Sequence, residues 1–257
     1  MVESEQVRYE RDGAAAVVTI DRPQRRNAVD GPTAVALHEA LERFEGEEDA
    51  RVMVLCGAGG VAFCAGADLK AIDTFGDRLM APEGPMGFTR LTPSKPTIAA
   101  ISGYALAGGL ELALWCDLRI ATEGSRLGYP ERRWGVPLID GGTQRLPRIV
   151  GLGRGLDLIL SGRMVHSEEA LNMGLLTEVV APGRHLERAL EYAEALAAFP
   201  QVTMLADRRA AIEGFGLPLD AGLAVEAKAG METFGTAVEG AGRFAAGEGR
   251  GGAGAGV

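Results

Sequence analysis

The sequence predicts an α/β fold whose C-terminal part is helical. Runs of β-branched residues of strand length alternate with helix-length segments up to about residue 151, and beyond it the apolar residues recur at helical spacing. The chain has 257 residues, of which 47% are hydrophobic and 24% charged. This length and composition predict a globular protein with a substantial core, arranged as one large domain or as one domain with a helical appendage.

The first part of the chain alternates strands with helices. After Gly31, Pro32 suits the first turn of a helix, in which Leu37 and Phe44 share one face and which ends near Gly46. The expected strands are residues 14–20, 51–55, 98–101 and 118–121. Strands separated by segments of this length favour a core built partly of parallel pairs.

The second part is predicted to be helical. Ser167 is the expected N-cap of one helix and Gly174 its expected stop. The expected helices are residues 155–160, 167–173, 186–199 and 219–238. The ending GEGRGGAGAGV has no apolar periodicity, so a mobile tail is expected there.

Charge and cysteine usage exclude some partners. A net charge of -9 argues against nucleic acid, because phosphate binding needs a clustered excess of Lys and Arg. Three cysteines, an odd number, favour a reducing compartment over a disulfide framework. The first residues, MVESEQVRYERDG, are charged and lack the apolar stretch of a secretory signal, so a cytoplasmic location is expected.

One apolar stretch, residues 97–115, has the length of a membrane span. It contains the carboxylate of Glu111 and the glycines Gly103, Gly108 and Gly109. A carboxylate inside such a run costs ~2.5–3.5 kcal/mol on insertion scales. A buried strand, a glycine turn and a helix therefore describe the stretch better, and no membrane partner is expected.

The first candidate site is the glycine-rich stretch of residues 57–70. Taken alone, its glycines predict only a tight turn, but Gly57–Ala62 also matches the loose GxGxxA pattern of a dinucleotide-binding loop. That loop should open a helix directly, whereas residues 61–64 suggest extended chain. The helix is expected to begin later, at residues 68–70.

The second candidate site spans residues 101–135. Gly108 and Gly109 lead into a predicted helix on which Glu111 has only apolar neighbours, so its carboxylate is expected to face a poorly solvated place. Glu131 follows twenty residues later, beside Arg132 and Arg133. Considered alone, Glu131 would be a surface salt-bridge residue and Glu111 a satisfied core carboxylate.

Four blocks of the chain together resemble the enoyl-CoA hydratase/isomerase (crotonase) family, in its order and at its spacing. These blocks are VVTIDRPQRRNAV (17–29), AFCAGADLK (62–70), SKPTIAAISGYALAGGLELALWCDLRIA (94–121) and YPERRWGVPLIDGGTQRL (129–146). The resemblance implies a spiral of ββα units over residues 1–195, a C-terminal helical trimerisation region over 196–240 and a flexible glycine-rich tail over 241–257. It also implies a homotrimer or a dimer of trimers.

The resemblance assigns roles to residues by position. It implies that the backbone N–H groups of Ala67 and Gly108 form an oxyanion hole for a thioester carbonyl, and that Glu111 and Glu131 are the two catalytic glutamates. It implies that an acyl-coenzyme A substrate binds without a permanently bound cofactor, the coenzyme A being part of the thioester. The implied coenzyme A-binding residues are Arg25, Arg26, Ala28, Ala65, Asp68, Leu69 and Lys70.

The implied reaction is syn addition of water to a 2-enoyl-CoA. Negative charge moves onto the thioester oxygen, where two N–H donors stabilise it, and a base and an acid handle the water and the α-proton. Glu111 would activate the water and Glu131 would donate the proton. An isomerase can work with one carboxylate at the position of Glu131, so the presence of both favours a hydratase, with isomerisation or another reaction of the family as the alternative.

The chain departs from the family pattern at PLIDGG, residues 137–142, where hydratases usually read IPGAGG. Ile139 could narrow the acyl pocket. Asp140 is either the N-cap of the helix that follows or a third carboxylate touching substrate.

Two other classes compete with this interpretation. An NAD-dependent oxidoreductase would depend on Gly57–Ala62 and would leave Glu111 unexplained, and a non-catalytic coenzyme A-binding scaffold would keep the fold without the chemistry. No metal site is expected, because the three histidines, His38, His166 and His185, lack the spacing of zinc ligands.

Overall fold

The computed structural model describes residues 6–247. The chain divides into two compact units, Met1–Ala193 and Glu194–Val257. The first unit carries both sheets and the second is helical.

The larger sheet has six strands in the order β1-β2-β3-β5-β7-β10. Its first pair is antiparallel and the other pairs are parallel. The strands are β1 (Val7–Asp12), β2 (Ala15–Ile20), β3 (Val52–Gly57), β5 (Thr97–Ile101), β7 (Leu118–Thr122) and β10 (Glu178–Val180). Strands β2, β3 and β5 are buried at every position, which explains why their sequences are apolar apart from one threonine each in β2 and β5. The charged edge strand β1 and the short β10 escaped prediction because neither has such a run.

The smaller sheet has the order β4-β6-β8-β9. Its strands have three residues each, too few for a periodic pattern: β4 (Ala62–Cys64), β6 (Tyr104–Leu106), β8 (Arg126–Gly128) and β9 (Met164–His166). Along the chain, β3, β5 and β7 of the larger sheet are each followed by β4, β6 or β8 of the smaller one and then by a helical segment. The expected repeat of ββα units is therefore present.

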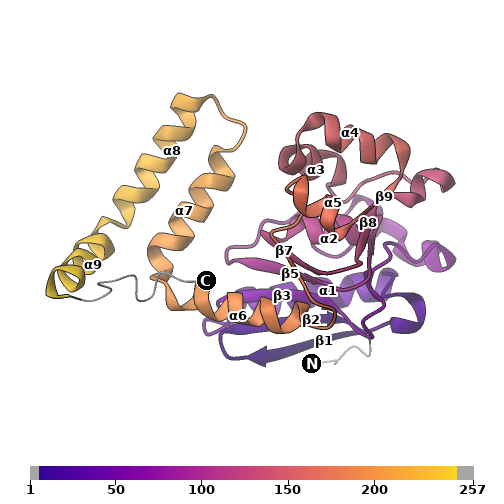
Figure 1. The fold of residues 1–257 in the computed structure, drawn as a ribbon, viewed down its shortest axis with the longest axis horizontal. Coiled ribbons are helices and arrows are strands. Elements are labelled where there is room, and N and C mark those ends of the chain that lie inside the picture. The colour runs from indigo at the N-terminus through magenta and orange to yellow at the C-terminus, as the bar shows by residue number, and fades with distance from the viewer. Residues whose placement is uncertain (1–5, 248–257) are drawn as a thin grey trace. The chain divides into compact units, whose positions relative to one another are not determined.

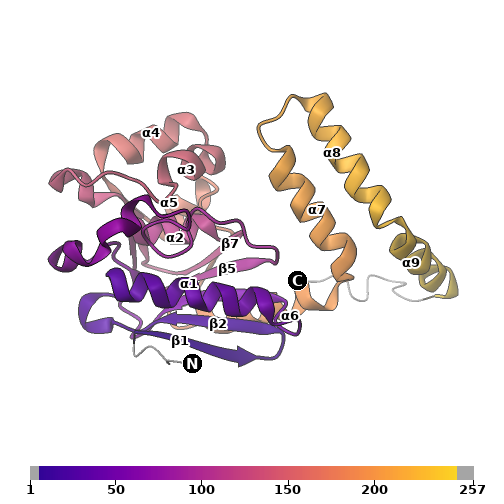
Figure 2. The same ribbon diagram turned by 180° about the vertical axis from the view of Figure 1, so that it is seen from behind.

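The helical segments of the first unit cover the sheets. Figure 2 shows α1 lying across β1 and β2, and its buried residues include Leu37, Leu41 and Phe44. Asp30 caps this helix by accepting the Thr33 N–H at 3.0 Å. The segments are η1 (Pro23–Arg25), α1 (Gly31–Gly46), η2 (Leu69–Met80), α2 (Gly108–Trp115), η3 (Pro130–Trp134), α3 (Gly142–Val150), α4 (Leu152–Ser161), α5 (Ser167–Asn172) and α6 (His185–Ala198), the η segments being 3-10 helices. The boundary between the two units, after Ala193, falls within α6.

The predicted cap of α5 is wrong by one residue. His166 is the N-cap and makes no capping bond with its side chain. Ser167 is the first helical residue, and its hydroxyl instead accepts the Gly124 N–H at 3.2 Å. The Ser167 hydroxyl, which the local sequence pattern predicted as a cap, is therefore used in a tertiary contact with Gly124 instead.

The second unit contains α7 (Gln201–Gly214), α8 (Leu219–Glu232) and α9 (Phe234–Ala246), and α7 and α8 lie side by side (Figure 1). The single helix predicted over residues 219–238 is wrong, because Thr233, at φ −109° and ψ 4°, separates two helices. Residues 241–246 are helical and do not belong to a tail, whereas residues 248–257 of the predicted tail lie outside the described residues. Among residues 6–247, no helix combines the length and the apolarity that crossing a membrane requires.

Candidate active site

A cavity of about 480 Å³ opens in the first unit between η2, the start of α2, η3 and the segment of residues 134–140. Most of its wall is apolar, formed by side chains such as Leu69, Ile72, Phe75 and Leu79. The carboxyl-bearing residues in the wall are Glu111, Glu131 and Asp140. The cavity is thus suited to an apolar group that has to meet acidic side chains.

The N–H of Ala67 points away from Val29, because Val29 forms its backbone hydrogen bonds with the residues on either side of Ala67. The Val29 N–H donates to the Gly66 carbonyl at 2.8 Å, and the Asp68 N–H donates to the Val29 carbonyl at 2.7 Å. In a parallel bridge of this kind the middle residue, Ala67, turns its own N–H away from the partner strand. Ala67 also lines the cavity.

Gly108 begins α2 and lies close to Gly66, the residue before Ala67. Its N-cap, Ala107, has φ 54° and ψ −130°, a region that residues other than glycine rarely adopt. A Cβ placed on Gly66 would lie 2.7 Å from the Ala107 Cβ and 3.0 Å from the Gly108 nitrogen, so a larger residue at 66 would force the two segments apart. Both predicted donors, Ala67 and Gly108, line the cavity, and neither N–H has an acceptor within residues 6–247.

Glu111 projects from the first turn of α2 and is 2% exposed. Its Oε1 accepts the N–H of Asp140 at 3.0 Å and that of Gly142 at 2.7 Å. A Cβ on Gly142 would lie 2.9 Å from this oxygen and 2.6 Å from the Tyr129 hydroxyl, so the position requires glycine. Burial raises the pKa of Glu111 to about 8, and the nearby charge of Asp140 adds to the rise.

Glu131 is held by η3, which begins with Pro130 and ends at Gly135 in the left-handed conformation. It is 6% exposed, so its interpretation as a surface salt-bridge residue is wrong. Within the described part of the chain, neither carboxylate oxygen has a hydrogen-bond partner. Burial raises the pKa of Glu131 to about 7.

Asp140 does not cap a helix, because α3 begins at Gly142 with Gly141 as its N-cap. Its Oδ1 instead accepts the Met86 N–H at 3.0 Å and the Thr89 hydroxyl. Its own N–H donates to Glu111. Asp140 therefore ties the segment of residues 86–89 to the Glu111 carboxylate, and burial raises its pKa as well.

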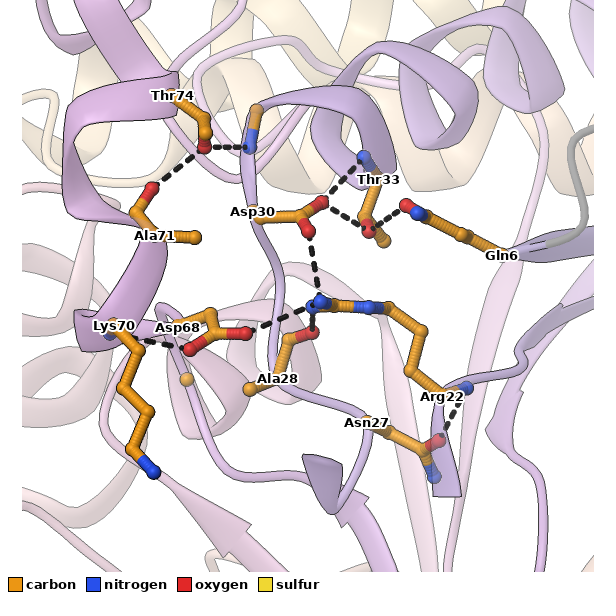
Figure 3. A network of polar contacts seen from close by, with 12 residues as sticks. Gln6, Arg22, Asn27, Ala28, Asp30, Thr33, Asp68, Lys70, Ala71 and Thr74 are labelled. Carbon is orange, nitrogen blue, oxygen red and sulfur yellow. Dashed lines mark hydrogen bonds and ion pairs between the residues drawn. The ribbon is translucent and has the colours of Figure 1, made fainter. Parts of the chain in front are cut away.

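The seven residues predicted to bind coenzyme A occupy three kinds of environment. Ala65 and Leu69 line the cavity, and the side chains of Arg25, Arg26 and Lys70 are exposed. Ala28 and Asp68 are buried. Figure 3 shows that the Asp68 carboxylate points at Arg22.

The sequence prediction missed several residues of this site. The cavity-lining residues of η2 recur at three- to four-residue intervals, a helical pattern that could have identified them. Tyr129 is fully buried, and its hydroxyl has no partner within residues 6–247. Met86 and Trp134 also line the cavity, but no local signal distinguishes either from an ordinary apolar residue.

The competing dinucleotide-loop interpretation is wrong. Gly57 ends β3, residues 58–61 form a turn, and β4 follows with no helix. The 3-10 helix η2 begins at Leu69 after the N-cap Asp68, as the sequence predicted. Within residues 6–247, no group of three or more His, Cys, Asp or Glu side chains is arranged to hold a metal ion.

Two predicted N–H donors and three carboxyl groups of raised pKa, those of Glu111, Glu131 and Asp140, therefore line one mostly apolar cavity. Donors of this kind stabilise a developing oxyanion, and carboxyl groups that titrate near neutral pH can exchange protons with a bound molecule.

Comparison with known proteins agrees with this arrangement. The family model described as enoyl-CoA hydratase/isomerase matches residues 10–247. The short-chain-enoyl-CoA hydratase of Clostridium acetobutylicum is 36% identical over 239 residues, which cover 91% of this chain and 92% of that protein. The carnitinyl-CoA dehydratase of Salmonella arizonae is 40% identical over 197 residues, 75% of each chain.

A solved structure shows the same fold. The crystal structure of an enoyl-CoA hydratase from Mycobacterium marinum superimposes with a TM-score of 0.88 at 36% identity, covering 94% of this chain and 96% of that one. The two sheets, the repeated ββα units and the sequence matches lead to one conclusion: this chain belongs to the enoyl-CoA hydratase/isomerase (crotonase) family.

Proposed function

We propose that the protein is an enoyl-CoA hydratase that adds water syn across the double bond of a 2-enoyl-CoA. The observation that carries the proposal is the convergence, on one apolar cavity, of two buried glutamates and two N–H groups that have no acceptor within residues 6–247. Relatives named as hydratases at 36% identity support it.

The N–H groups of Ala67 and Gly108 form the oxyanion hole in this proposal. When water attacks the β-carbon, the electron pair of the double bond moves toward the thioester oxygen as an enolate. Two donors already aimed at that oxygen stabilise the charge without reorganising, and losing one such donor typically costs ~2.7–4 kcal/mol of barrier. The orientation of α2 adds the positive end of its dipole near the same place.

Glu111 and Glu131 divide the proton transfers. Glu111 accepts a proton from water as the water oxygen bonds to the β-carbon. Glu131 then donates a proton to the α-carbon as the enolate collapses. The hydrogen bonds that two N–H groups donate to Glu111 favour its carboxylate form, and burial, with no hydrogen-bond partner for either oxygen among the side chains and backbone of residues 6–247 other than its own N–H, favours the neutral form of Glu131. The pKa values of about 8 for Glu111 and about 7 for Glu131 order the two groups the other way in the free protein, so the assigned roles require the bound thioester to lower the pKa of Glu111 below that of Glu131.

The acyl chain occupies the apolar part of the cavity, and coenzyme A arrives as part of the substrate without a permanently bound cofactor. The exposed cations of Arg25, Arg26 and Lys70 are suited to contact the anionic nucleotide end. Ala65 and Leu69 contact the thioester arm. Ala28 and Asp68 are buried and support this wall from behind.

The second candidate is an enoyl-CoA isomerase that moves a proton between two carbons. The observation that favours it is the difference between the glutamates, since Glu111 is held by two N–H groups whereas both oxygens of Glu131 lack a partner within residues 6–247. One carboxyl group that accepts a proton from one carbon and returns it to another is sufficient for isomerisation.

The active protein is a homotrimer or a dimer of trimers in this proposal. Large apolar side chains are exposed along the second unit: Leu219, Leu223, Met231, Phe234, Val238 and Phe244. Such a run is expected to be covered by another copy of the chain. Analytical ultracentrifugation should show a trimer or a hexamer, and a monomer at micromolar concentration would contradict the proposal.

The test of function is loss of the conjugated-enone absorbance of crotonyl-CoA. The wild-type protein should hydrate crotonyl-CoA, and Glu111→Gln should abolish this while leaving affinity for coenzyme A largely intact. A 3-enoyl-CoA assay distinguishes the two candidates, because an isomerase should remain active in Glu111→Gln and lose activity in Glu131→Gln. Binding of crotonyl-CoA without turnover would indicate a scaffold.

A further inference from the structure

A buried ionic cluster lies outside the cavity, behind the wall that carries Ala67. Arg22, just after β2, is 8% exposed, and its Nη2 lies 2.7 Å from the Asp30 carboxylate and 3.1 Å from the Asp68 carboxylate. Its Nη1 donates to the Ala28 carbonyl. Figure 3 shows both carboxylates pointing at the same end of the guanidinium.

Each partner of Arg22 is also bonded to its own segment. Asp30 caps α1 through the Thr33 N–H, and the other oxygen of Asp68 accepts the Lys70 N–H at 3.2 Å. The guanidinium therefore joins the end of β2, the start of α1 and the loop before η2. A planar fork with several donors suits this task, whereas an ammonium presents one nitrogen.

The strained turn that precedes α1 is held in the same way. Arg26 and Asn27 both adopt left-handed conformations, at φ 52° and φ 56°. The Asn27 amide is fully buried, accepting the Arg22 N–H at 3.0 Å and donating to the Ala58 and Ala62 carbonyls. Strained conformations of this kind persist only where surrounding interactions hold them, and here the hydrogen bonds of Asn27 do so. We therefore expect the segment that contains Val29, the partner of Ala67, to be rigid.

One member of the cluster, Asp68, directly follows Ala67 in the sequence. Ala67 and Leu69 line the cavity, and Asp68 between them turns its side chain the other way, toward Arg22, as alternation in extended chain requires. Val29, which pairs with the backbone on both sides of Ala67, lies between Ala28 and Asp30, two of the groups that Arg22 contacts. The guanidinium therefore holds both strands of the bridge that directs the Ala67 N–H.

We infer that Arg22 and Asp68 are positioning residues that aim the Ala67 N–H at the thioester oxygen. This inference rests on the proposed function, since it assigns the cluster to the oxyanion hole of that reaction. Neither side chain touches the substrate. Their effect is on the polarisation of the carbonyl and on kcat, with little effect on KM, because the apolar wall of the cavity that binds the acyl chain is retained.

Three variants of the cluster and one surface control test the inference. Asp68→Asn keeps an oxygen for the Lys70 N–H and loses the charged bond to Arg22, and Arg22→Lys keeps the charge without the fork. Asp30→Asn loses an ion pair with the same guanidinium while keeping the Thr33 cap, on the segment that does not carry Ala67. Asp21→Asn breaks an exposed pair with Arg8 one residue away from Arg22 and controls for surface charge.

The decisive measurement is the infrared stretching frequency of the thioester carbonyl in bound butyryl-CoA labelled with carbon-13 at that carbonyl. The wild-type protein should lower the frequency, because two N–H donors polarise the bond. Asp68→Asn and Arg22→Lys should lose much of this shift, and kcat for crotonyl-CoA should fall about tenfold or more, less than the ~10²–10³-fold loss expected when a donor is removed. Asp30→Asn should lose less, and Asp21→Asn should match wild type.

The outcomes separate the two proposals. If the wild-type protein shifts the carbonyl and Asp68→Asn and Arg22→Lys shift it equally, the positioning role is wrong while the proposed function stands. If the wild-type protein binds the labelled thioester without any shift, the oxyanion hole itself is wrong. Thermal unfolding of each variant identifies a merely structural effect, which would lower Tm and leave the shift of the folded fraction unchanged.

Discussion

Two groups of buried carboxylates in this molecule have different environments. Asp30 and Asp68 are each 7% exposed and share the guanidinium of Arg22. Glu111 and Glu131 are 2% and 6% exposed, and neither has a salt bridge within residues 6–247. Equal burial thus has opposite consequences: a paired carboxylate holds segments together, whereas one without a cation has a raised pKa and can exchange protons.

The largest expected effect of this difference is on catalysis. Glu131→Gln should lower kcat for hydration by ~10²–10⁴-fold, because the amide cannot donate the proton to the α-carbon. KM should change little. Steady-state kinetics with crotonyl-CoA measures both, and full activity in this variant would remove Glu131 from the reaction.

On the paired side, Arg22→Met should destabilise the fold. Removing the cation leaves two carboxylates buried without a positive charge, although each keeps its backbone hydrogen bond, and breaking a buried ion pair in this way typically costs about 3–5 kcal/mol of unfolding free energy. Urea unfolding at pH 7 measures the loss. An unchanged midpoint would mean that the cluster contributes no net stability, and the contrast between the two groups would then be lost.

Substituting a carboxylate that has no cation should instead stabilise the fold, as the expected pH dependence of stability shows for Glu131. The pKa of Glu131 is about 7 in the folded protein against 4.5 in the unfolded chain, so the folded state binds the proton more tightly and loses stability as pH rises from 4.5 to 7. Glu131→Gln should therefore be more stable than wild type by about 1–3 kcal/mol at pH 8 and nearly equal to it at pH 4. Equal stability at both pH values would show that Glu131 carries no burial penalty.

The smallest expected effect concerns the pH dependence of the rate. The active form holds one proton on the glutamate pair, so kcat/KM should follow a bell with its maximum between about pH 7 and 8. Asp140→Asn keeps an acceptor for Met86 and removes the charge that raises the pKa of Glu111, so the alkaline limb, near pH 8, should move to lower pH. A profile that does not move would mean that the charge of Asp140 leaves Glu111 unaffected.

Local pattern was sufficient to predict most elements of the first unit. Apolar runs predicted β2, β3, β5 and β7, since a strand buried on both faces needs apolar residues throughout. It failed where an element is short or polar, as in the three-residue strands of the smaller sheet, and where one residue breaks a helix, as at Thr233.

The residues of the candidate site divide in the same way. The glycine pair and the isolated glutamate in an apolar helix are local signals that pointed to Gly108 and Glu111, whereas Ala67 and Glu131 were selected through the resemblance of four motif blocks to the enoyl-CoA hydratase/isomerase family. The partners of Asp68 and Asp140 depend on the tertiary fold. Arg22 lies 46 residues before Asp68, and Thr89 lies 51 residues before Asp140. Only chain packing brings these segments together, so the tertiary structure decides which buried carboxylate has a cation beside it and which has none. That pairing in turn decides which buried acid is structural and which is reactive.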